Sequence, residues 1–111
     1  MTNDLPTRIL LATDGSDDAA AAARTATELS NKLGAGLEVV YVGEAPLVYR
    51  PEYHGYQTLL ESQRAEARRL LDEQVERVAA AGGDVTQAHL RMGRPDAEIV
   101  ALAERGGALA A

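Results

Sequence analysis

Hydrophobic residues along the chain fall into three runs that predict β-strands. The first two runs, residues 8–13 and 37–42, are largely continuous, and the lack of alternation is typical of strands buried on both faces. The third run, residues 85–92, alternates apolar with polar positions and predicts an edge strand with one polar face. His89 belongs to that polar face, so we expect its side chain to point to solvent.

Between these runs, apolar residues recur at the spacing of amphipathic helices. Residues 17–33 predict an alanine-rich helix with Ser16 as its N-cap, and residues 58–81 predict a second helix. Pro95 suits the first position of a third helix, whose core side is expected to hold Ile99, Val100, Leu102 and Ala103. Strand and helix alternate three times, which predicts an α/β fold with a parallel sheet and right-handed crossovers.

Length and composition suit a single domain over residues 1–111. The net charge of −6 argues against a nucleic-acid partner, which usually requires a basic face. No apolar run reaches membrane-spanning length and the N-terminus does not resemble a signal peptide, so a cytoplasmic location without membrane contact is expected. The chain has no cysteine, which excludes disulfides, thiolate metal sites and a cysteine nucleophile.

The segment A-T-D-G-S, residues 12–16, joins the first predicted strand to the first predicted helix. Open parallel sheets bind ligands at the carboxyl ends of their strands, and Asp14 stands at that position. Its carboxylate could bind a ligand or cap the helix, and the residues alone weigh these two roles evenly. Neither a P-loop nor a dinucleotide fingerprint is present. The segment is also similar to the D-x-D-G-T start of haloacid dehalogenase phosphatases, but Ala12 stands where their nucleophilic carboxylate would be, which disfavours a phosphatase.

Three segments together resemble the universal stress protein family. They are the A-T-D-G-S junction, the V-V-Y-V end of the second strand, and R-M-G-R-P-D-A-E-I-V-A-L-A-E at residues 91–104. The resemblance covers almost the whole chain. It implies a flavodoxin-like fold, also described as adenine nucleotide alpha hydrolase-like, with three layers and a parallel sheet of strand order 3-2-1-4-5.

Many members of that family bind ATP at the carboxyl ends of the strands. By position, the resemblance implies that Asp14 contacts ribose or phosphate and that Val42 touches adenine. It also implies that the backbone near Ala12 and Thr13 lines the adenine pocket, and that Gly93 lies near the nucleotide.

The sequence departs from the family pattern at its C-terminal end. ATP-binding members carry G-x-x-G-x(9)-G-[ST] after the fourth strand, where backbone N–H groups hold the phosphates. Here the sequence ends at Ala111 with only A-L-A-A, so the fold is expected to be C-terminally truncated and its pocket to hold adenosine at most. One edge of the first strand would then be bare, and we expect residues 107–111, a second copy of the chain or a further segment to cover it.

The leading hypothesis is a universal-stress-protein-like module of the stress response that is not an enzyme. It would bind ATP, with Mg²⁺, or another adenine nucleotide at the ends of the first two strands. The alternative is a non-nucleotide-binding interaction module of the same fold that acts through dimerisation. The missing glycine loop favours this alternative for the sequence as it stands, and a homodimer is expected.

Overall fold

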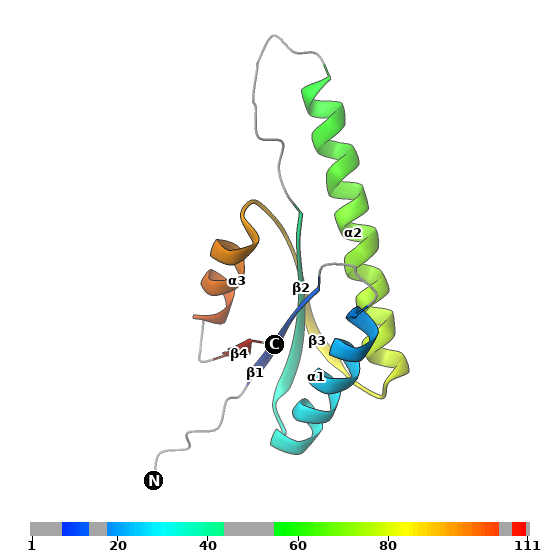
Figure 1. Ribbon diagram of the computed structural model, residues 1–111, viewed down its shortest axis with the longest axis vertical. Coiled ribbons are helices and arrows are strands. Elements are labelled where there is room, and N and C mark those ends of the chain that lie inside the picture. Colours follow the sequence, from blue (N-terminus) through cyan, green and yellow to red (C-terminus); the bar gives the residue numbers. More distant parts are fainter. Residues whose placement is uncertain (1–7, 14–17, 44–54, 105–107, 111) are drawn as a thin grey trace.

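The computed structural model describes residues 8–13, 18–43, 55–104 and 108–110, in which strands and helices alternate (Figure 1). The elements are β1 (Arg8–Thr13), α1 (Ala19–Leu33), β2 (Gly36–Gly43), α2 (Tyr56–Ala80), β3 (Val85–Met92), α3 (Pro95–Ala103) and β4 (Ala108–Ala110). The predicted α/β class is confirmed, and β1 and β3 have the predicted bounds.

The strands form one parallel sheet of order β3-β2-β1-β4. β1 therefore lies inside the sheet, as its continuous apolar run predicts. It pairs with β2 from Arg8↔Gly36 to Thr13↔Tyr41, and with β4 from Arg8↔Ala108 to Leu10↔Ala110. The expectation that residues 107–111 cover the second edge of β1 is confirmed for residues 108–110.

Helices cover both faces of the sheet, so the fold has three layers (Figure 1). α1 and α2 pack on one face, over a core in which alternate residues of β1 and β2 meet Ala23, Ala26, Leu71 and Val78. α3 packs on the opposite face, against Leu10 and Val40. Because strand side chains alternate in direction, neighbouring residues of β1 and β2 serve different cores. None of the helices in the described ranges is both long and apolar enough to cross a membrane.

Two details of the helices differ from the sequence-based predictions. α1 begins at Ala19 after Asp18, whereas Ser16, the expected N-cap, lies outside the described residues. Val100 does not belong to the core side of α3, because this residue is 52% exposed. The residues of α3 that pack on the sheet are Ile99, Leu102 and Ala103, which share one helix face through their spacing of three and four.

His89 does not point to solvent, so that prediction is wrong. Its Nε2 lies 2.7 Å from Oε1 of Glu38, and only 13% of its side chain is exposed. Glu38 on β2 also accepts two hydrogen bonds from Arg8, at 2.5 Å from Nε and 2.9 Å from Nη2. The hydrogen bond from Arg8 is the main cause that lowers the pKa of Glu38, and His89 adds to it against the effect of burial. The carboxylate is thus ionised and held between two neighbouring strands.

Candidate functional site

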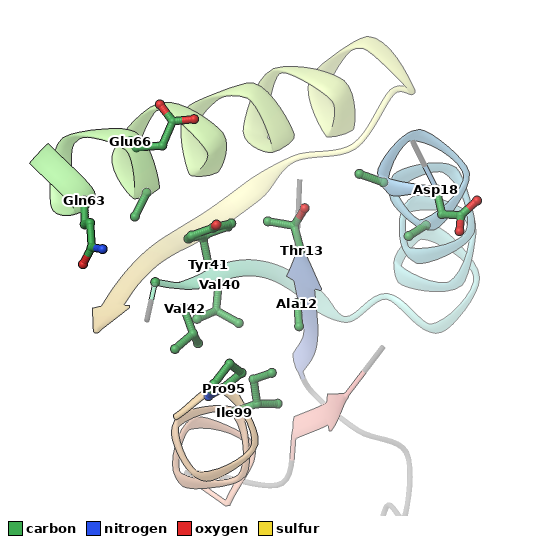
Figure 2. A pocket seen from close by; sticks show the side chains of 14 residues that line it. Ala12, Thr13, Asp18, Val40, Tyr41, Val42, Gln63, Glu66, Pro95 and Ile99 are labelled. Atoms are coloured by element: carbon green, nitrogen blue, oxygen red, sulfur yellow. The ribbon is translucent and has the colours of Figure 1, made fainter. Parts of the chain in front are cut away.

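A cavity of about 750 Å³ lies at the carboxyl ends of β1 and β2. This volume is within the usual range of small-molecule sites. Its walls come from both central strands and from all three helices (Figure 2). The lining residues are Ala12, Thr13, Asp18, Ala19, Ala22, Val40, Tyr41, Val42, Gly43, Gln63, Glu66, Ala67, Pro95 and Ile99.

One wall of the cavity is apolar. Ala12 of β1 and Val40 and Val42 of β2 belong to the face that α3 covers, and Pro95 and Ile99 stand opposite them (Figure 2). Pro95 is the first residue of α3, so the start of this helix is fixed beside the end of β2. Together these residues form the apolar side of the cavity, called the aliphatic slot below, and apolar surfaces of this kind accept a flat apolar or aromatic ring.

The other wall carries the polar groups. Thr13 and Tyr41 come from the strands, Asp18 from the start of α1, and Gln63 and Glu66 from α2 (Figure 2). Hydrogen bonding to Arg69 is the main cause that holds the pKa of Glu66 below its usual value, so this carboxylate is ionised at neutral pH. Among the described lining residues there are two carboxylates and no Lys or Arg. The described cavity therefore favours hydrogen-bond donors over strongly anionic groups.

Glycines hold the strand ends together at the rim. A Cβ built on Gly43 would lie 2.8 Å from Sδ of Met92 and 3.2 Å from Cβ of Ala67, so a larger residue here would require the Met92 side chain and Ala67 to shift. The N–H of Gly93 donates to the carbonyl oxygen of Gly43 at 2.9 Å. Gly93 has φ +149°, a conformation that favours glycine, and it stands next to the cavity rim without lining the cavity.

The structure brings together Ala12, Thr13 and Val42, three of the five residues that the resemblance selects. Gly93 is connected to the rim through Gly43. Asp14 lies outside the described residues. Within the described ranges, no group of three or more His, Asp or Glu side chains is arranged to hold a metal ion.

The sequence reasoning missed Gln63, although a signal for it exists. Gln63 and Gln74 fall on the helical stripe of Ala67, Leu71 and Val78, at spacings of three and four. Polar residues that interrupt an apolar stripe need a partner. Gln74 has one, because its Nε2 donates to the carbonyl oxygen of Ala19 at 2.9 Å, whereas Gln63 lines the cavity.

Comparison with known proteins identifies relatives of this fold. A family model described as the universal stress protein family matches residues 6–108. Universal stress protein UspA from Lactobacillus plantarum is 27% identical, with a TM-score of 0.72, and the match covers 93% of this chain and 72% of that one. A member of the same family from Burkholderia pseudomallei is 25% identical, with a TM-score of 0.63 and coverage of 99% and 98%.

A third solved structure is a universal stress protein in complex with cAMP. It is 23% identical, with a TM-score of 0.65, and the match covers 90% of this chain. This chain spans 65% of the length of that protein. No curated protein matches the sequence.

Proposed function

The chain belongs to the universal stress protein family, and from that premise we propose that it is a stress-response module that binds an adenine nucleotide. The observation that carries the proposal is the cavity at the carboxyl ends of β1 and β2. Parallel sheets bind nucleotides at this edge because side chains from two strands and the following helices converge there. The similar universal stress protein whose structure was solved in complex with cAMP supports an adenine nucleotide as the ligand.

In this proposal the base enters the aliphatic slot beside Val42, and the ribose lies toward Ala12 and Thr13. Asp14 follows Thr13 directly and would contact ribose or phosphate, as the family resemblance implies. Gly93 would act through Gly43 by fixing the end of β3 at the rim. None of these roles requires a catalytic group, so the module acts by binding.

The charges of the lining suggest which part of the ligand the cavity holds. Asp18 would repel a triphosphate placed beside it, whereas the charge of Glu66 is paired with Arg69. Because the described lining holds no Lys or Arg, a nucleoside or a singly charged nucleotide fits best. ATP remains a ligand if its phosphates extend past the rim. Magnesium would then enter with the phosphates, because Mg²⁺ keeps several waters and binds largely through phosphate oxygens.

Calorimetric titration with AMP, cAMP and Mg–ATP tests the proposal. Val42→Phe places a ring in the space that the base would occupy. It should therefore weaken binding by about tenfold or more. Val100→Phe makes the same substitution at an exposed position of α3 and should leave binding unchanged. If the unmodified chain binds none of the three compounds at millimolar concentration, or if Val42→Phe binds as well as Val100→Phe, the proposal is wrong.

A second candidate function, association without nucleotide, has a separate structural basis. β4 is the terminal strand of the sheet in the described part of the chain, so the backbone groups on its outer edge can pair with another strand. A homodimer formed at this edge would support the interaction module. Light scattering of the purified chain tests it, and a mass of one chain across the micromolar range would argue against it.

A further inference from the structure

We propose that Gln63 recognises the 6-amino group of the adenine base, so that its side-chain oxygen determines the base specificity of the cavity. This inference rests on the proposed nucleotide function. Oε1 of Gln63 is shielded from solvent and has no hydrogen-bond partner, and within the described part of the chain no other buried side-chain oxygen or nitrogen lacks one. Buried acceptors in native proteins are almost always satisfied, so this one marks a place where a donor is missing.

The contrast with Gln74 shows that the missing partner is specific to the cavity. Both glutamines lie on the α2 face that packs toward the sheet; Gln74 is fully buried there, and Gln63 is partly buried with its Oε1 shielded from solvent. Gln74 satisfies the carbonyl oxygen of Ala19 and so joins α2 to α1. Gln63 lies three turns earlier, where the cavity separates α2 from β2 and the described chain offers no donor.

The position of Gln63 suits a base that enters the aliphatic slot. Its side chain extends from α2 toward the end of β2, where Val42 stands (Figure 2). Val42 belongs to the sheet face that α3 covers and α2 packs on the other, so a base that rests on Val42 and extends past the end of β2 would present an edge to the carboxamide. The exocyclic 6-amino group of adenine is an N–H donor, and an amide oxygen is a strong acceptor for it.

The choice of test ligand follows from the chemistry of the carboxamide. An amide can rotate and donate through its nitrogen, so a 6-oxo purine is a poor negative control. Purine riboside 5′-monophosphate lacks the 6-amino group and puts no oxygen in its place. Comparing it with AMP isolates the single N–H that Oε1 is proposed to accept.

The experiment is a cycle of two ligands and three proteins, measured by calorimetry. The unmodified chain should bind AMP roughly tenfold more tightly than purine riboside monophosphate, which is the typical effect of one buried hydrogen bond. Gln63→Leu should bind the two ligands equally. Gln57→Leu changes an exposed glutamine of the same helix and should keep the preference.

Thermal unfolding of the ligand-free proteins separates recognition from a structural role. Gln63→Leu removes an unsatisfied buried acceptor, so its unfolding midpoint should equal or exceed that of the unmodified chain. A lower midpoint would show that Gln63 serves the fold, and would overturn the inference. Equal binding of both ligands by the unmodified chain would overturn it while leaving the nucleotide function intact. Failure to bind AMP at all would overturn both.

Discussion

Replacing Arg8 tests how much the ion cluster on β1, β2 and β3 contributes to stability. Arg8→Met removes two charge-assisted hydrogen bonds from the Glu38 carboxylate, whose side chain is only 7% exposed, and leaves it with His89 alone. Removing one partner of a fully buried pair costs about 3–5 kcal/mol. Because 22% of the Arg8 side chain is exposed, solvent screens part of this interaction. We therefore expect a loss of about 2–3 kcal/mol.

The assay is urea unfolding at pH 7 of a double-mutant cycle, with Arg8→Met, Glu38→Leu and the combination. The double variant leaves no buried charge without its partner, so it should lose much less stability than the sum of the single variants. The coupling energy should be about 2 kcal/mol. Single losses that add to within about 0.5 kcal/mol would refute the reasoning, because the two residues would then act independently.

Three further predictions concern pH and packing. The pKa of Glu38 is lowered in the folded state, so its contribution is present above the ordinary value of 4.5 and is lost as the pH falls through the lower folded value. The stability difference between the unmodified chain and Glu38→Leu should therefore shrink between pH 6 and about pH 3; a constant difference in urea titrations would contradict this. Leu71→Ala leaves a cavity at a fully buried position in the core beneath α2, and should lower the free energy of unfolding in urea by about 2–5 kcal/mol. A loss below about 1 kcal/mol would mean that the core collapses around the substitution. In Gly83→Ala, a Cβ would lie 2.6 Å from Cγ1 of Val78 and 2.7 Å from Oγ1 of Thr27. The unfolding midpoint should therefore fall by an amount equivalent to about 1–3 kcal/mol. An unchanged midpoint would show that both side chains can move aside at little cost in free energy.

The order of strands and helices can be predicted from the sequence because the spacing of hydrophobic residues depends on local structure. The continuous run of β1 and the alternation of β3 predict both strands with their observed bounds. Pro95 correctly predicts the start of α3. These features depend on residues close in sequence, so one chain is enough to identify them.

Features that depend on strand register could not be predicted in the same way. Alternation assigns His89 to a polar face, but it cannot show that β2 presents Glu38 to the same face from a neighbouring position. The prediction that Val100 belongs to the core fails for a related reason. The nine-residue helix α3 packs only one narrow stripe of residues on the sheet, and Val100 lies outside it. Predicting the cavity requires both the strand register and the packing of the helices. Gln63, for example, comes to line the cavity only after α2 has folded back along the sheet.

The short length of β4 makes the two sides of β1 unequal in amide hydrogen exchange. Successive N–H groups of a strand point to opposite neighbours, so one set of β1 amides faces β2 and the other faces β4. β2 pairs with all six residues of β1, whereas β4 pairs with three. Amides that face β2 should exchange only when the whole sheet unfolds, whereas those that face β4 need only the separation of a three-residue strand. The central strand of the sheet should therefore show two exchange rates that alternate from residue to residue.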